Sequence, residues 1–373
     1  MEENENTKRS FLAPVQAWYV KYERPASSVA LIGGFVLDFL TLQRVDALWE
    51  NSWIIFHLTV VATCIILLNR KKATSGTLDI QENTKSHFWY VTAMQFSFGG
   101  LLSAFLLFYF RSSSFFVSWP FLLILALAFA ANERLKQHIE RTTFHISFFF
   151  LALYLFAIYI IPVLTHQMGP FMFALSGAAC IVVFILFLSI LQIVTGQMFL
   201  RGHPKLLFAI IGIFSCINIL YVSNIMPPIP LSLKEGDIYH SIEKDISGSY
   251  VVLREKKTLS EYFSPYQLVH TTPGVALYAY SAVFSPTKLN TEIVHVWQRY
   301  DLEEKEWQTM STIPLSLTGG RNGGYRTFSL KENMTSGKWR VSVETPKGQV
   351  VGRLYFTVVT ENAPPILFTE IES

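Results

Sequence analysis

The sequence predicts a protein in two parts, an α-helical membrane bundle of about seven spans followed by an all-β domain. Three observations lead to this fold class. The chain is 51% hydrophobic and only 15% charged, whereas soluble domains carry about a quarter charged residues. Leu, Ile, Phe, Val and Ala dominate from Ser28 to Tyr221. Beyond Pro227 the composition is that of a soluble domain, with short alternating runs separated by turn residues.

The bundle is predicted from seven apolar runs, since a membrane helix needs about 20 mostly apolar residues. They are approximately Ser27–Leu42, Trp53–Asn69, Phe88–Phe110, Phe115–Ala131, Phe144–Leu164, Phe171–Thr195 and Leu206–Val222. The first run is short and contains Asp38. No cleavable signal peptide is expected before it, because Met1–Arg24 is polar and mixed in charge. The expected segments are a cytoplasmic N-terminus (1–26), the bundle (27–222), a proline-containing linker (223–248) and an exported domain (249–373).

The orientation of the bundle is predicted from the basic residues of its loops. One alternate set of loops contains thirteen Lys and Arg, and the other contains only Arg44 and Arg111. Because cytoplasmic loops carry the excess of basic residues, we expect the N-terminus in the cytoplasm and the C-terminal domain outside a plasma (inner) membrane.

The C-terminal domain contains six clear strand-like runs. They are Val275–Phe284, Glu292–Tyr300, Trp307–Leu317, Tyr325–Leu330, Lys338–Glu344 and Val350–Val359. In GKWRVSVET, Trp339, Val341 and Val343 alternate with polar residues, which indicates one buried face. A hairpin turn is expected at Lys347–Gly348. Six or seven short strands in about a hundred residues are typical of an immunoglobulin-like β-sandwich.

The segment GGRNGGYR, Gly319 to Arg326, resembles a phosphate-binding loop in composition. Such a loop works at a helix N-terminus, whereas this one joins two strands. Its glycines are accounted for by a wide turn with positive φ. As a second hypothesis, Arg321, Tyr325 and Arg326 offer guanidinium donors and an aromatic face to a sugar or an acidic group. Trp297 is a further candidate for such a binding surface, although most aromatic residues of a sandwich belong to its core.

The region from about Ala276 to Val359 resembles a known bacterial family. AVFSP, HVWQR, IPLSLTGGRNGGYRTFS and GKWRVSVET with GQVVGRLYFTV are similar to number 2914 in the domain-of-unknown-function series. The resemblance covers about a quarter of the chain. It implies a cell-envelope protein with a β-sandwich module, and it implies no activity or functional residue.

Two polar residues inside the predicted spans form a second candidate site. Asp38 and His57 are each about five residues from the same outer loop, so they share a depth in the membrane. As a pair they would lower each other's cost of burial and could move a proton. The alternative is that Asp38 is hydrated near the surface or packed as a neutral acid.

The sequence excludes several classes of function. From Pro228 onward there are 15 Lys and Arg against 16 Asp and Glu, so no basic excess points to nucleic acid. No H-E-x-x-H, G-x-S-x-G, Walker or C-x-x-C motif is present. The histidines are scattered, and we expect no metal site and no cofactor.

Two functions remain open. In the first, which we favour, the protein is non-enzymatic: the bundle anchors or signals, and the sandwich binds an envelope glycan or an exported protein. In the second, the bundle is a transporter or a lipid-linked-sugar enzyme with its site near Asp38 and His57. Acidic residues in the first outer loop, Asp46 and Glu50, agree with the second function, but that loop is short. The lipid bilayer is a partner under both, and the oligomeric state is left open.

Overall fold

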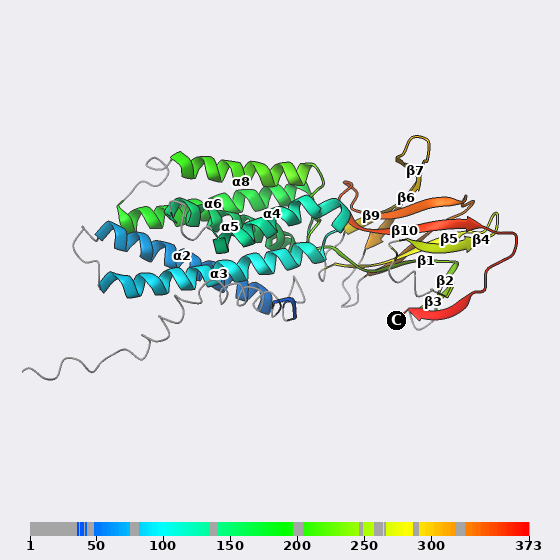
Figure 1. The fold of residues 1–373 in the computed structure, drawn as a ribbon, viewed down its shortest axis with the longest axis horizontal. Coiled ribbons are helices and arrows are strands. Elements are labelled where there is room, and N and C mark those ends of the chain that lie inside the picture. Colours follow the sequence, from blue (N-terminus) through cyan, green and yellow to red (C-terminus); the bar gives the residue numbers. More distant parts are fainter. Residues whose placement is uncertain are drawn as a thin grey trace, which may run out of the picture. The chain divides into compact units, whose positions relative to one another are not determined.

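The computed structural model describes residues 36, 38–40, 42, 48–74, 82–134, 141–196, 204–245, 249–256, 264, 266–285, 291–317 and 325–372. These residues fall into two compact units that alternate along the chain. One unit lies within residues 1–107, 125–152 and 191–197, and the other within residues 108–124, 153–190 and 198–373. Helices occur up to residue 222, and the strands follow (Figure 1).

The helices coincide with six of the seven predicted spans. They are α2 (Leu48–Thr74), α3 (Glu82–Arg111), α4 (Phe115–Arg134), α5 (Arg141–Thr165), α6 (Pro170–Thr195) and α8 (Pro204–Val222). All except α4 are long and apolar enough to cross a membrane, and the apolar stretch of α4 is the shorter Val117–Ala130. Most of the first predicted span lies outside the described residues. The chain therefore has membrane-type helices, and seven spans remain a prediction.

Close packing and neutral hydrogen bonds join the helices within each unit. In the first unit, Gly100 lets α3 approach α2, because a Cβ at Gly100 would lie 3.2 Å from His57 Nε2. In the second unit, Asn218 donates to the hydroxyl of Tyr154 at 3.1 Å and links α8 to α5. Small residues and uncharged polar side chains commonly join membrane helices.

The β-domain, residues 232–372, contains all the described strands. They are β1 (Ser232–Tyr239), β2 (Ser241–Lys244), β3 (Tyr250–Arg254), β4 (Gln267–Thr271), β5 (Leu277–Phe284), β6 (Thr291–Tyr300), β7 (Trp307–Leu317), β8 (Tyr325–Lys331), β9 (Gly337–Glu344), β10 (Val350–Thr360) and β11 (Phe368–Glu372). They form a three-stranded sheet β1-β5-β8, a five-stranded sheet β4-β10-β9-β6-β7 and a three-stranded sheet β11-β3-β2.

The sheets stack in three layers, with β1-β5-β8 in the middle. Residues of β1 and β5 pack against the inner face of the five-stranded sheet. The largest buried side chains on that face are Trp297 and Trp339. Tyr280 and Ala282 of β5 point the other way and pack with Tyr250 and Val252 of β3. The predicted sandwich is present, and a small third sheet covers its second face.

The linker expected at 223–248 is corrected, because β1 and β2 both lie within it. β1 pairs with β5 from Ser232↔Phe284 to Tyr239↔Tyr278. The prolines at positions 227, 228 and 230 favoured the prediction of a linker. The charged residues of β1 and β2 interrupt the alternation of polar and apolar residues that would have predicted strands. The turn predicted at Lys347–Gly348 is confirmed, since Gly348 has a φ of 82° and its N–H donates to Thr345 O at 2.8 Å.

Candidate functional site

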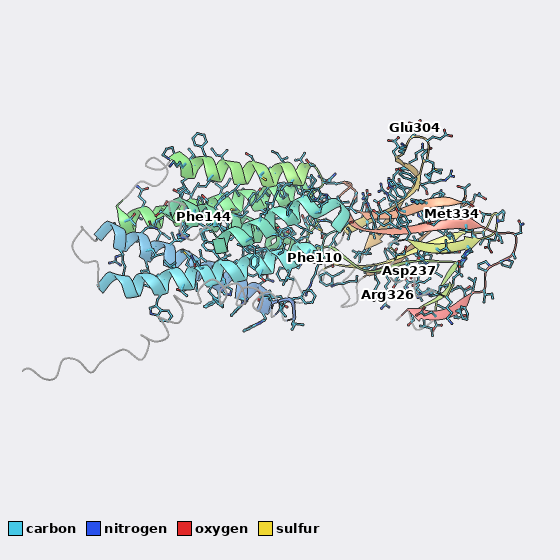
Figure 2. The ribbon with its side chains drawn as sticks, in the orientation of Figure 1. Phe110, Phe144, Asp237, Glu304, Arg326 and Met334 are labelled. Carbon is cyan, nitrogen blue, oxygen red and sulfur yellow. The ribbon has the colours of Figure 1, made fainter. Side chains whose placement is uncertain are left out.

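The two described residues of the glycine-rich segment, Tyr325 and Arg326, do not share one surface. Arg321 lies outside the described residues. Tyr325 and Arg326 begin β8, where successive side chains point to opposite faces. Tyr325 packs against the core cluster that contains Val283 and Val343. Arg326, labelled in Figure 2, stands on the other face of that sheet, where the hydroxyl of Tyr250 contacts its carbonyl oxygen at 3.4 Å. These two residues therefore cannot jointly bind one small ligand.

Trp297 is completely buried, so it is a core residue and not part of an exposed binding surface. Its indole N–H donates to Ser329 Oγ at 3.0 Å. The same hydroxyl contacts His295 Nδ1 at 2.8 Å, and His295 Nε2 contacts Ser281 Oγ at 2.8 Å. Burial lowers the pKa of His295 to about 4. This satisfied polar network joins β6 to the middle sheet and specifies how the two sheets face each other.

The structure does not bring Asp38 and His57 into contact among the residues that it describes. The ring of His57 is 98% buried and lies 4.6 Å from the Trp53 ring centroid and 5.8 Å from that of Phe96. Its Nδ1 has no hydrogen-bond partner within the described part of the chain. His57 is therefore a buried histidine in an aromatic cage, and none of the described acidic residues contacts it to support a proton relay.

A different group of side chains gathers on the outward face of the five-stranded sheet. The cross-strand register places Gln298 of β6 opposite Arg340 of β9, and Arg340 opposite Tyr355 of β10. Tyr300 of β6 lies opposite Trp307 of β7. We call the set the aromatic–basic strip; it consists of Tyr266, Tyr300, Trp307, Lys338, Arg340 and Tyr355. All six side chains are partly or fully exposed.

Ring contacts connect the strip across the sheet. Ring centroids are 5.3 Å apart for Tyr300 and Trp307, 6.1 Å for Trp307 and Tyr355, and 5.4 Å for Tyr355 and Tyr266. Such separations are within the favourable range for aromatic pairs. The strip thus forms a continuous aromatic surface over strands that are far apart in the sequence.

Arg340 is held in place at the centre of the strip. Its guanidinium carbon lies 4.4 Å from the centroid of the Trp307 ring, and its Nε donates to Gln298 Oε1 at 2.7 Å. Burial and the neighbouring Arg353 lower the pKa of Arg340. No ion pair to Arg340 is present among the described residues. Tyr355 and Glu344 offset part of the repulsion by Arg353, but the pKa of Arg340 is still lowered.

The acidic residues near the strip lie beyond its ends. Glu344 is two positions along β9 from Ser342, and burial raises the pKa of its carboxyl. Figure 2 shows Glu304 at the tip of the β6–β7 hairpin, which projects from the sheet. At its base the carboxylate of Asp301 accepts the backbone N–H of Glu303 at 2.8 Å. The centre of the strip is therefore basic, with acidic groups at its margins.

A cluster of titratable groups also lies beside β4. Glu255 contacts His240 Nε2 at 2.9 Å and His270 Nδ1 at 2.6 Å. Burial by itself would raise the pKa of Glu255, but hydrogen bonds from His240 and His270 outweigh it, and the pKa is lowered. Within the described residues, no group of three or more His, Cys, Asp or Glu is placed to hold a metal ion. The cluster connects the end of β3 to β4 through hydrogen bonds and has a structural role.

The strip was not predicted from the sequence, although Tyr300, Trp307 and Tyr355 all lie in predicted strand-like runs. Alternation in β9 and β10 points Arg340 and Tyr355 outward, and this was the available signal. The sequence does not give the order of the strands in the sheet. In the structure β10 pairs antiparallel with β9 on one side and in parallel with β4 on the other, and this order brings the strip residues together.

The structure thus has membrane-type helices followed by a C-terminal β-domain that carries the strip. Residues 290–358 match the family described as "Protein of unknown function (DUF2914)", which confirms the resemblance expected from the sequence. The match extends from just before β6 to near the end of β10 and so includes every strip residue except Tyr266. No curated protein matches the chain closely enough to count as a relative.

Two solved structures show only a weak likeness. An immunoglobulin-like protein from Pseudomonas aeruginosa is 12% identical, with a TM-score of 0.21, and the alignment covers 35% of this chain and 97% of that one. The alkylpurine DNA glycosylase AlkC from Pseudomonas fluorescens is 9% identical, also with a TM-score of 0.21, and the alignment covers 85% of this chain and all of the glycosylase chain. At these scores neither likeness bears on function.

Proposed function

We propose that this protein is a non-enzymatic, multi-pass protein of the bacterial cell envelope that binds a glycan or an exported protein through the aromatic–basic strip. In this proposal seven spans anchor the chain in the plasma membrane, with the N-terminus in the cytoplasm and the β-domain outside. The bundle anchors the domain or passes on a signal from it.

The observation that carries the proposal is the pairing of partly exposed aromatic rings with a fixed cation. Aromatic rings outside a core offer amphipathic contact area at low entropic cost. Arg340, held by Trp307 and Gln298, loses little further freedom when it binds a ligand. The core of the domain is complete without these residues, since Trp297 and Trp339 fill it from the inner face.

The membrane orientation predicted from the sequence is part of the proposal and gives a test of it. A reporter that is active only outside the cytoplasm is expected to work when fused after Ser373 and to fail when fused after Lys72. The physical reason is the thirteen-to-two distribution of basic residues in the loops, since such residues are retained on the cytoplasmic side. Activity at Lys72 together with silence at Ser373 would invert the topology and contradict the proposal.

The alternative is a transporter or a lipid-linked-sugar enzyme with its site near Asp38 and His57. The buried Nδ1 of His57, which has no hydrogen-bond partner among the described residues, is the observation in its favour, because a buried polar atom without a partner is costly. Its aromatic surroundings and the lack of a described contact with Asp38 count against a reactive centre, so we rank this alternative second.

A further inference from the structure

We propose that the ligand of the aromatic–basic strip is an acidic glycan, an oligosaccharide that carries carboxylate groups. The inference rests on the proposed function and narrows the glycan-or-protein choice to one chemical class. Three features of the strip lead to it: the state of its central cation, the kind of apolar surface around that cation, and the position of the nearby acidic groups.

The first feature is the like-charge pair Arg340 and Arg353. Arg353 Nε donates to Ser342 Oγ at 3.2 Å. Ser342 is two residues from Arg340 on β9, so both side chains lie on the same face of the sheet. Lys338 adds a third cation, 5.5 Å from the centroid of the Tyr266 ring. Partial burial weakens the hydration of Arg340, and Arg353 repels it. Glu344 and Tyr355 offset only part of this cost, since the pKa of Arg340 is still lowered. A further anion beside the guanidinium would therefore be favourable. A carboxylate also matches the planar fork of a guanidinium.

The second feature is the apolar surface, which suits sugars better than a protein. The strip offers tyrosine and tryptophan rings with polar groups among them, such as the Gln298 amide, which also donates to Thr309 Oγ1 at 3.2 Å. Protein interfaces are also rich in tyrosine, tryptophan and arginine, but their fully buried core is depleted of lysine and acidic residues, whereas Lys338 belongs to the strip. Rings interleaved with hydrogen-bonding groups fit the hydroxyls and the C–H faces of a pyranose.

The third feature is the position of the nearby acidic residues, which determines the direction in which such a glycan would bind across the sheet. Glu304 at the hairpin tip (Figure 2) and Glu344 on β9 lie beyond the two ends of the strip along the strand direction. An acidic chain running along the strands would meet these carboxylates. A chain lying across the strands, from Tyr266 to Trp307, would meet rings and cations only. The strip therefore selects an acidic glycan in the cross-strand direction.

The experiment measures binding of tetragalacturonate to the full-length protein in detergent micelles by titration calorimetry. A neutral galactose tetramer and a short polyglutamate are the comparison ligands. We expect tetragalacturonate to bind at least about tenfold more tightly than either, because only it combines sugar rings with carboxylates. Arg340→Gln is expected to weaken that binding by about tenfold or more.

The matched control is Arg299→Gln, which removes the same charge from the same sheet. Arg299 is exposed, its Nη2 donates to Ser336 O at 3.3 Å, and it points to the opposite side of β6 from Gln298. This variant is expected to bind tetragalacturonate like the wild type. Unchanged hydrogen exchange in β9 and β10 of Arg340→Gln would show that its fold is intact.

The outcomes separate this inference from the proposed function. Equal binding of the neutral tetramer, with loss in Arg340→Gln, would overturn the acidic class and keep the strip as a glycan site. Equal binding of polyglutamate would reduce recognition to charge and overturn the inference. Tetragalacturonate binding that Arg340→Gln leaves unchanged would overturn the proposed site itself, and no binding of tetragalacturonate would overturn the inference.

Discussion

Replacing Trp339 by alanine is expected to lower the free energy of unfolding of the β-domain by about 3–5 kcal/mol. Trp339 is 99% buried on β9, which has a paired strand on each side. It packs in the cluster between the five-stranded sheet and the middle sheet. Its indole N–H donates to Thr335 O at 2.8 Å, so the change removes both apolar contacts and a hydrogen bond. Hydrogen exchange of the β10 amides in the full chain would report the lower opening free energy.

Lys338→Ala, one residue away, is the matched control for Trp339→Ala. Lys338 is exposed on the outward face, and surface changes of this kind usually alter stability by less than about 0.5 kcal/mol. Similar protection in the two variants would contradict the assignment of Trp339 to the core and of Lys338 to the open face.

Acidification from about pH 6.5 to pH 4 is expected to remove about 3 kcal/mol from the stability of the β-domain. His295 is completely buried, and burial lowers its pKa from the ordinary value of 6.5 to about 4. In this pH range the unfolded chain binds a proton that the folded domain rejects, so protons favour unfolding and stability rises with pH. Each tenfold difference in proton affinity corresponds to about 1.4 kcal/mol. Urea unfolding followed by tryptophan emission at several pH values would measure the loss.

His295→Gln separates this effect from general acid denaturation. Glutamine keeps a donor and an acceptor near Ser281 and Ser329 but does not titrate. The variant is expected to be less stable at pH 7, with a much flatter dependence between pH 6.5 and 4. An unchanged slope would show that the acid sensitivity comes from other groups, such as the Glu255 cluster.

Among the strands, those predicted best from the sequence are the ones in which buried and more accessible residues alternate. In β9 and β10 the buried residues Trp339, Val341, Leu354 and Phe356 alternate with the more accessible Lys338, Arg340, Arg353 and Tyr355, so pattern alone locates the strands and their inner faces. The helices were equally clear, because a long run of apolar residues is typical of a membrane span and rare elsewhere. β1 and β2 were missed because their charged residues break the alternation, and pairing with β5 and β3 stabilises them instead.

The candidate site depended on information that a single sequence does not contain. The glycine-rich loop stood out in composition, yet Tyr325 and Arg326 are adjacent residues of a strand and so cannot share a face. The strip is assembled from four sheet strands and the approach to a fifth, and only their order brings Tyr266, Arg340 and Trp307 together. Trp297 and Trp307 look equivalent in the sequence, and alternation alone does not decide between them, because the pairing of β6 with β7 shifts register at Trp297/Gln298.

The most direct test of the central claim, that the strip is an open binding face outside the cytoplasmic membrane, is cysteine labelling in intact bacterial cells. Thr309, an exposed residue beside the strip, is replaced by cysteine and treated with a membrane-impermeant maleimide. Ala73→Cys at the end of α2 is the control on the side that is predicted to be cytoplasmic, and the wild type reports the three native cysteines. We predict that Thr309→Cys is labelled in intact cells and that tetragalacturonate slows the reaction, whereas Ala73→Cys is labelled only after permeabilisation. Labelling of Thr309→Cys only in permeabilised cells would contradict the account.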